Sequence, residues 1–249
     1  MNYKEIVKEV LLTEAKELEI ASSSISFDIE NIVNLIIKSK GKLIVTGVGK
    51  SGLVGAKIAA TLASTGTSSF FLHPTEAMHG DLGMIGKEDI VLAISYSGES
   101  EELIQILPHI KRFNIPLIAM AKDENSTLAK YSDYFININV QKEACPLDTA
   151  PTSSTTLTMA MGDALAVCLM KKRDFKKEDF ASFHPGGSLG KKLFVKVDDL
   201  LRKENLPIVS RETKLKDAIL VMREGRLGSV IITDEQDKVI ALLRDGELR

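Results

Sequence analysis

The chain has 249 residues, of which 44% are hydrophobic and 27% are charged, and its formal net charge is −2. Such a composition is ordinary for a globular protein and leaves room for one large domain and a smaller one. The nearly neutral charge argues against nucleic acid or an anionic membrane surface as a partner, and no apolar run reaches the ~20 residues of a membrane-spanning helix.

The beginning of the chain predicts two helices. Residues 3–20 have apolar residues at helical spacing among many lysines and glutamates, which is typical of an amphipathic helix. So many charges exclude the apolar centre of a secretory signal peptide, and we therefore expect a cytoplasmic protein. A second helix begins near Phe27 and Asp28 and runs to about Lys40, where Gly41 stops it.

The next hundred residues alternate between short apolar runs and helical patterns. This alternation with short connections predicts an α/β fold in which a five-stranded parallel sheet is flanked by helices. The expected strands are 42–46, 69–72, 90–94, 116–120 and 134–138, and the expected helices are 53–64, 99–113 and 125–131.

The stretch from Ile90 to Glu102 combines a buried strand with a polar turn. Residues 90–94 are continuously apolar, as expected of a strand buried on both faces, and the turn Ser95–Ser100 (SYSGES) leads from it into a helix. Hydroxyls and free backbone N–H groups therefore gather at the amino end of a helix, which favours a bound anion. We interpret this turn as a phosphate-binding site, with Glu101 and Glu102 beside it as a possible acid or base.

A second glycine-rich turn, Gly47–Gly52 (GVGKSG), follows the first strand. It matches the GxGxxG pattern of dinucleotide-binding proteins, but the next strand ends in FLHP and lacks the acidic residue that would hold a ribose. A Walker A loop is also excluded, because Ile44 occupies the position of its first glycine. Lys50 at the mouth of the turn is a candidate to pair with a phosphate or to polarise an oxygen atom.

The segment after the fifth strand is polar and then helical. Residues 145–156 (CPLDTAPTSSTT) form a hydroxyl-rich loop that leads into an apolar helix at about 155–170. Beyond it the chain is charged and irregular, and His184 precedes Pro-Gly-Gly in a loop shaped to approach another group. The cysteines, Cys145 and Cys168, fit no CxxC pattern, and both are expected to be free thiols.

The pattern of apolar and polar residues changes near residue 195. Residues 198–249 predict short strands around one helix at 215–223. We therefore expect one domain at 1–195, with its core at about 40–175, and a small α+β domain at 196–249.

Several other side chains are candidates because of their positions. Glu102 and Glu143 both lie on loops at the carboxyl ends of strands, which converge on one crevice in an open α/β sheet. His73 and His79 follow the second strand, but neither a carboxylate nor a cysteine at suitable spacing completes a metal site with them. His184 lies outside the sheet, and we expect a functional role for it.

Taken together, these segments resemble the sugar isomerase (SIS) domain family and, within it, the D-arabinose 5-phosphate isomerases. Residues 196–249 resemble the beginning of a cystathionine-β-synthase (CBS) domain. Relatives normally carry two CBS domains in tandem, so this chain is expected to be truncated. The resemblance to the isomerases is carried by GVGKSG (47–52), ASTGTSSFFLHPTEAMHGDLGM (63–84), SYSGES (95–100), KEACPL (142–147), APTSSTT (150–156), MGDALAV (161–167) and FHPGGSLG (183–190).

The resemblance implies a role for particular residues. It assigns catalysis to Lys50, Glu102, Glu143 and His184. It places the substrate against Ser51, Gly66, Thr67, His73, His79, Ser95, Ser97, Gly98, Ser100, Ser153 and Ser154. It further implies that no organic cofactor or metal is required, that His73 is a possible site for inhibitory zinc, and that the protein is a homotetramer with shared active sites.

The activity that the resemblance implies is the interconversion of D-ribulose 5-phosphate and D-arabinose 5-phosphate through an enediol, in the supply of 3-deoxy-D-manno-octulosonate for lipopolysaccharide or capsule. That chemistry needs a base with a pKa raised toward neutrality and a donor at the developing oxyanion. Glu143 and Glu102 are both candidates for the base. The alternatives are a non-catalytic sugar-phosphate sensor and an SIS isomerase for another sugar phosphate.

Overall fold

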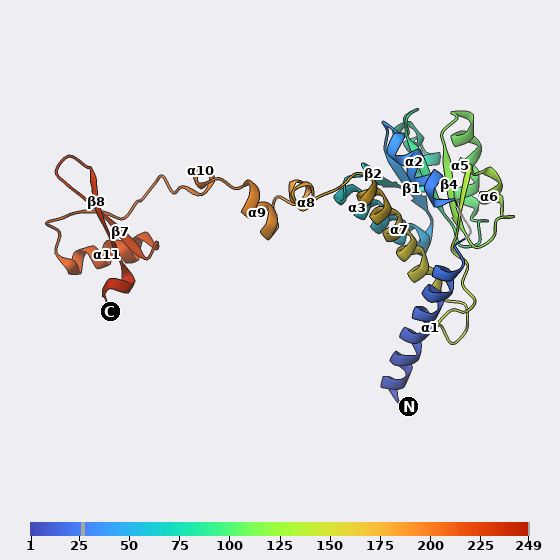
Figure 1. Cartoon of the computed structure of the whole chain (residues 1–249), viewed down its shortest axis with the longest axis horizontal. Helices are drawn as coiled ribbons and strands as arrows, with labels where there is room; N and C mark the ends of the chain where they lie inside the picture. The colour runs from blue at the N-terminus through green and yellow to red at the C-terminus, as the bar shows by residue number, and fades with distance from the viewer. Residues whose placement is uncertain (26–27, 249) are drawn as a thin grey trace. The chain divides into compact units, whose positions relative to one another are not determined.

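The structure is a computed structural model, and it describes residues 1–25 and 28–248. Its helices and strands follow one another along the chain as the colours of Figure 1 show. Two helices come first, α1 (Tyr3–Ser23) and α2 (Ile29–Lys38). The expected start of the second helix at Phe27 lies outside the described residues. Asp28 caps α2, because its carboxylate accepts a hydrogen bond from the Asn31 N–H at 3.1 Å.

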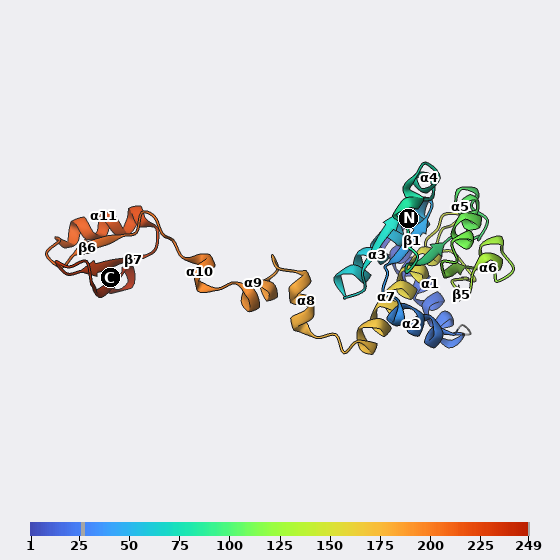
Figure 2. The same ribbon diagram turned by 90° about the horizontal axis from the view of Figure 1, so that it is seen from above.

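A five-stranded parallel sheet forms the centre of the first part of the chain, as the sequence predicted. Its strand order is β2-β1-β3-β4-β5, so β1 and β3 are neighbours in the middle of the sheet. Figure 2 shows this part of the chain from above, with β1 and β5 labelled. The strands are β1 (Leu43–Gly47), β2 (Ser69–Leu72), β3 (Ile90–Ile94), β4 (Leu117–Ala121) and β5 (Tyr134–Asn137). The connecting helices are α3 (Gly49–Ser64), α4 (Pro74–Met78), η1 (Asp81–Met84), α5 (Glu101–Arg112) and α6 (Thr127–Tyr131).

Each face of the sheet is covered by its own set of helices. Helices α2, α3 and α7 (Ser153–Lys172) pack with Val45, Leu92 and other strand residues on one face. Helices α4, α5 and α6 pack with Ile44, Val91 and their neighbours on the other. Consecutive residues of one strand therefore enter different cores, which explains why β1, β3 and β4 are apolar at nearly every position.

Helix α3 begins earlier than the sequence indicated, at Gly49 rather than near residue 53. The change of direction is confined to Val48 and Gly49, where the φ of Gly49 is +57°. Gly52 then allows the helix to approach the sheet, since a Cβ atom there would lie 2.7 Å from the Gly47 carbonyl oxygen. As a result, Lys50 and Ser51 belong to the first turn of a helix and not to a loop.

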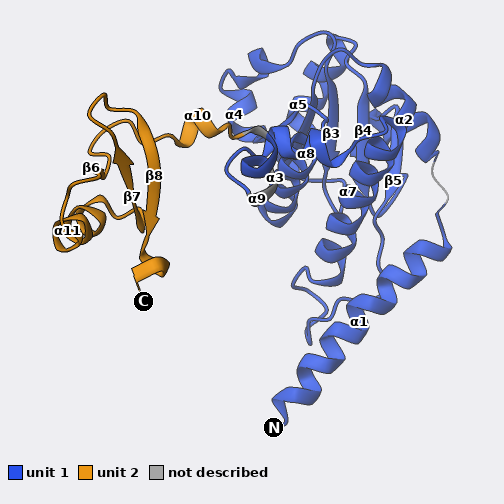
Figure 3. Cartoon of the chain, turned by 60° about the vertical axis from the view of Figure 1, so that its left-hand side comes forward, with its two compact units in different colours: residues 1–193 blue, residues 194–249 orange. Residues whose placement is uncertain are grey.

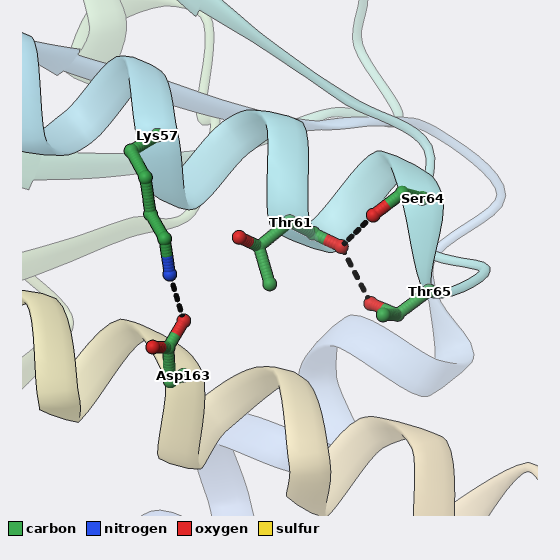
Figure 4. A network of polar contacts seen from close by, with 5 residues as sticks. All are labelled: Lys57, Thr61, Ser64, Thr65 and Asp163. Carbon is green, nitrogen blue, oxygen red and sulfur yellow. Dashed lines mark hydrogen bonds and ion pairs between the residues drawn. The ribbon is translucent and has the colours of Figure 1, made fainter.

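Helices α3 and α7 are in close contact. A Cβ atom at Gly162 would lie 2.4 Å from Cγ1 of Ile58, so this position has no room for a larger side chain. Lys57 and Asp163 form an ion pair across the same contact, and the Thr61 carbonyl accepts hydrogen bonds from the Ser64 and Thr65 hydroxyls near the end of α3 (Figure 4).

Helix α7 is long and apolar enough to cross a membrane by length and composition alone. However, Leu157, Leu165 and Leu169 are buried in the core between α7 and the sheet. This packing is that of a core helix of a globular domain.

The chain divides into two compact units, Met1–Leu193 and Phe194–Arg249, coloured separately in Figure 3. Near the boundary between the units the chain forms two helices that the sequence did not predict, α8 (Lys177–Phe183) and α9 (Ser188–Phe194). In the second unit β6 pairs in parallel with β7, which pairs antiparallel with β8, around a core of Ala218, Met222 and Val230. Its elements are α10 (Val197–Leu200), β6 (Ile208–Ser210), α11 (Leu215–Gly225), β7 (Ser229–Thr233), β8 (Val239–Arg244) and η2 (Asp245–Leu248).

Candidate active site

The strand order places a crevice between the carboxyl ends of β1 and β3. From β1 the chain crosses through α3 to β2 on one side, and from β3 it crosses through α5 to β4 on the other. Such a reversal point is where open α/β sheets bind their ligands. Gly47 is paired in register with Ile94 at these strand ends. The two turns that the sequence singled out are therefore neighbours.

The turn after β3 is held by its own side chains. The Ser95 hydroxyl lies 2.9 Å from that of Ser100 and accepts the Gly98 N–H at 3.1 Å. Gly98 has φ +71°, and a Cβ atom there would lie 2.3 Å from the Ser126 hydroxyl oxygen. The structure thus requires glycine in this turn and brings the Ser95 and Ser100 hydroxyls together at the start of α5, where a helix end favours an anion.

Lys50 and Ser51 lie beside this turn on the first turn of α3. They line one small pocket together with Tyr96 of the turn after β3 and with side chains at the beginning of α7. Its walls include Lys50, Ser51, Tyr96, Ser154, Thr155 and Thr158. The Lys50 side chain is exposed. The structure therefore brings together a cation, the serine of the GVGKSG turn and the hydroxyl cluster that precedes α7.

Ser153 adds a buried donor next to this pocket. It is 1% exposed, and its hydroxyl has no hydrogen-bond partner within residues 1–25 and 28–248. A buried hydroxyl without a partner is costly. Ser153 and Ser154 are two of the residues that the family resemblance placed against the substrate.

Glu143 is the most constrained of the candidate residues. Its Oε2 accepts hydrogen bonds from the Thr152 N–H and hydroxyl, both at 2.8 Å, and from the Ser154 N–H at 3.2 Å. The side chain is 9% exposed. These bonds satisfy the free N–H groups at the amino end of α7, so the carboxylate caps that helix beside the pocket.

This geometry reverses one expectation, namely that a glutamate in a closed pocket has a raised pKa. Burial does raise the pKa of Glu143, but hydrogen bonds from Ser154 and Thr152 stabilise the ionised form and outweigh it, so the pKa lies below its ordinary value. The sequence could not reveal this, because the donors belong to a helix end nine and eleven residues further along the chain.

Replacing Glu143 with Gln should change the acid stability of the protein. Because the folded-state pKa is lowered, the ionised carboxylate stabilises the fold above the unfolded pKa of ~4.3, and this contribution is lost as the pH falls through the folded pKa. Urea unfolding at pH 7 should show E143Q to be less stable by about 1–2 kcal/mol, with the difference shrinking toward pH 3. Equal loss at both pH values would contradict the assignment, and Glu124→Gln, at an exposed site, is the matched control.

Tyr96 joins the two loops that border the pocket. Its hydroxyl accepts the Val140 N–H at 3.4 Å, and the Lys122 ammonium lies 5.4 Å from the centre of its ring. Burial raises the pKa of Tyr96, and the bond from Val140 acts in the opposite direction. The phenol therefore remains a neutral wall of the pocket.

Glu102 and the two histidines of the second connection lie on the same edge of the sheet. Glu102 is exposed in the first turn of α5, directly after the serine turn. His73 follows β2 and caps α4, where its Nδ1 accepts the Thr75 N–H at 3.3 Å, and His79 is exposed at the other end of that helix. Within the part of the chain that the structure describes, no three His, Cys, Asp or Glu residues form a metal site.

Gly66 and Thr67 are not brought to the pocket of their own chain. They lie after the far end of α3, where a Cβ atom at Gly66 would be 2.8 Å from the Phe175 ring and Thr67 bonds to Arg173. Both precede β2, whereas the pocket is at the carboxyl ends of the strands. The family resemblance placed both residues against the substrate but did not indicate at which edge of the sheet they lie.

His184 is also outside this pocket. It ends α8, stacks on Phe180 with ring centres 3.9 Å apart, and its Nδ1 lies 2.9 Å from the Phe180 carbonyl oxygen. The neighbouring Phe183 stacks on Phe175 at 6.3 Å. Phe175 lies three residues beyond the end of α7, whose other end bears Ser153. The 20 residues of α7 span ~30 Å. That length separates His184 from the pocket.

Comparisons with known proteins identify the family to which this fold belongs. The SIS domain model matches residues 35–168. The probable arabinose 5-phosphate isomerase of Haemophilus influenzae is 45% identical over 249 residues, covering 100% of this chain and 73% of the relative. The arabinose 5-phosphate isomerase KdsD of Pseudomonas aeruginosa is 50% identical over 223 residues, covering 89% and 68%. Among solved structures, that of E. coli CFT073 c3406 in complex with arabinose 5-phosphate is similar with a TM-score of 0.72 and 40% identity, covering 74% of this chain and 100% of that one.

Proposed function

The chain belongs to the SIS domain family, and from this premise we propose that it is an arabinose 5-phosphate isomerase, which interconverts D-ribulose 5-phosphate and D-arabinose 5-phosphate. The observation that carries the proposal is the likeness to arabinose 5-phosphate isomerases along the chain, at 45% and 50% identity. The crevice between β1 and β3 supports it, because an anion-binding turn, a lysine and two carboxylates gather at one edge of the sheet.

The substrate phosphate is assigned to the serine turn. Ser95, Ser97, Gly98 and Ser100 offer hydroxyls and amides at the start of α5, and Ser51 offers a further hydroxyl from α3. Binding at the phosphate holds the distant carbons C1 and C2 in place, so binding energy is used to orient the reacting atoms. The hydroxyls of Ser153 and Ser154 are assigned to the sugar.

The chemistry is a proton transfer between neighbouring carbons. A base removes the proton from C2 of the open-chain aldose, and the electron pair forms the C1–C2 double bond while O1 becomes negative. Protonation of O1, loss of the O2 proton and return of a proton to C1 complete the ketose. We assign the stabilisation of the negative oxygen to the Lys50 ammonium. These steps use no organic cofactor or metal, and inhibition by zinc at His73 stays a prediction.

The geometry favours Glu102 over Glu143 as the base. All three hydrogen bonds to Oε2 of Glu143 stabilise its ionised form and lower its affinity for a proton. Glu102 is exposed in the first turn of α5, where its carboxylate is free to approach a bound sugar. We therefore assign proton removal to Glu102 and assign to Glu143 the binding of a sugar hydroxyl through its remaining oxygen.

The position of His184 supports a shared active site. A histidine separated by the length of α7 from the pocket of its own chain is available to the pocket of another copy. We propose that the protein is a homotetramer in which His184 completes a neighbour's site, where it opens the furanose ring or transfers the proton between O1 and O2. The site is proposed to operate in the cytoplasm, in the supply of 3-deoxy-D-manno-octulosonate, and residues 196–249 are proposed to be part of a CBS domain.

One experiment tests the activity directly. The purified protein is incubated with D-ribulose 5-phosphate in deuterated water, and the aldose formed is examined for deuterium at C2. We expect arabinose 5-phosphate labelled at C2, as proton exchange through an enediol requires. Binding of the substrate without conversion would overturn the proposal in favour of a sensor, and faster conversion of a hexulose or heptulose phosphate would favour another isomerase of the family.

A further inference from the structure

Helix α1 buries a carboxylate and leaves much of its apolar surface exposed. Glu17 is its one buried residue among those described, with 5% exposure, whereas Leu11 and Leu12 are 62% and 59% exposed. Figure 1 shows the amino-terminal part of α1 extending away from the sheet. Glutamate is among the residues least often buried, and a buried carboxylate needs compensating partners. Glu17 therefore calls for a specific explanation.

The partners of Glu17 are two backbone groups of a distant segment. Its Oε2 accepts the Gln141 N–H at 2.8 Å and its Oε1 accepts the Lys142 N–H at 3.1 Å. Within the described residues Glu17 forms no ion pair with a lysine, arginine or histidine. Both oxygens of the carboxylate are thus used to hold the chain immediately before Glu143.

The backbone N–H groups of residues 140–144 are bound by side chains and not by other backbone groups. The five consecutive N–H groups of residues 140–144 all donate to side-chain oxygens, which belong to Tyr96, Glu17 (twice), Asp148 and Thr152. Tyr96 and Thr152 belong to the pocket and its border, and Asp148 belongs to the loop itself. Glu17 is the member of this set that comes from α1.

A second contact joins the same helix to α7. Oε2 of Glu14 accepts the Thr156 hydroxyl at 3.0 Å, one turn before Glu17 on α1. Thr156 lies in the first turn of α7, near the helix end that Glu143 caps. Helix α1 therefore contacts the chain on both sides of Glu143. Glu17 binds the segment before it, and Glu14 binds the first turn of α7 after it.

We propose that Glu17 is a positioning residue for the isomerisation, in that it fixes the 140–143 segment and so sets where the Glu143 carboxylate lies. This inference rests on the proposed function, because Glu143 is assigned to the sugar there. A carboxylate suits the task because it accepts two amides at once through two oxygens, which an amide side chain does not. Among the described residues the hydrogen bonds of Glu17 go to Gln141 and Lys142 and not to the Ser95–Ser100 turn, so we expect Glu17 to act through Glu143 on the sugar and not on the phosphate.

The test compares Glu17→Gln with Glu19→Gln, which changes an exposed glutamate two residues further along the same helix. Binding-competent sites are counted by titration with D-arabinitol 5-phosphate, a sugar alcohol phosphate that lacks the reacting carbonyl. We expect E17Q to lose at least tenfold in kcat per binding site, since displacement of a site group by about 1 Å costs up to ~10²-fold. Its Kd for the alcohol phosphate, which keeps the hydroxyl assigned to Glu143, should rise by a smaller factor than kcat falls, and E19Q should change neither quantity.

Other outcomes decide against the inference. A merely structural role would reduce the number of binding sites and leave kcat per site unchanged. Failure of E17Q to fold would also overturn the proposal, because the contact would then belong to the fold as a whole. If the wild-type protein does not isomerise the substrate, the proposed function is rejected, and the role of Glu17 needs a test that does not depend on activity. The hydrogen bonds from Gln141 and Lys142 to Glu17 are then tested by amide hydrogen exchange at these two residues, which should accelerate in E17Q and not in E19Q.

Discussion

Replacing Glu102 with Gln should lower kcat by ~10²–10⁴ while the protein stays folded. The amide keeps the shape of the side chain but cannot take the proton from C2. Glu102 is exposed in the first turn of α5, where a negative charge contributes only about 0.3–1 kcal/mol through the helix dipole. The measurement is the rate of ribulose 5-phosphate isomerisation, with the thermal unfolding midpoint recorded for the same sample.

Glu101→Gln is the matched control for this experiment. Glu101 occupies the same first turn and is also exposed, so its replacement removes the same charge from the same helix end. We expect the activity of E101Q to remain close to that of the wild type. If E102Q retains full kcat and E143Q loses it, the base is Glu143 and the assignment of roles in the crevice is reversed.

The architecture of the sheet was predictable from the sequence to an unusual degree. Strands such as Ile90–Ile94 are buried on both faces and are therefore continuously apolar, and they alternate with helical patterns over short connections. The five-stranded parallel sheet is confirmed. The beginning of α3 was placed too late, because the glycines of GVGKSG suggest a loop, whereas Gly52 serves close packing of a helix on the sheet.

The site was predictable only where its parts follow strands directly. Lys50 and Ser95–Ser100 follow β1 and β3, and parallel strands bring their carboxyl ends to one edge. The lowered pKa of Glu143 depends on hydrogen-bond donors at the amino end of α7. The hydrogen bonds to Glu17 come from Gln141 and Lys142, which are 124 and 125 positions further along the chain. Gly66 and Thr67 are at the opposite edge, since α3 returns the chain across the whole sheet. No local pattern reports such long-range contacts.

Replacing Lys50 with Met should lower kcat by ~10²–10³, the cost of removing one group that stabilises a developing oxyanion. The aliphatic part of the side chain is retained, and the exposed position in the first turn of α3 predicts little change in stability. The KM for ribulose 5-phosphate should change much less than kcat, because the ammonium is assigned to charge that develops during the reaction. A raised KM with an unchanged kcat would instead assign Lys50 to the phosphate.

The same variant tests the shared active site. K50M and His184→Ala are each expected to be nearly inactive, and the two are then co-expressed in equal amounts so that subunits assemble at random. A site that takes Lys50 from one copy and His184 from another is intact in about a quarter of the combinations, so about a quarter of the wild-type activity should return. Sites built within single chains would return none, because every chain then carries one of the two defects. Recovery of activity on mixing would therefore place His184 across a subunit boundary, which is the arrangement proposed from its separation from the pocket of its own chain.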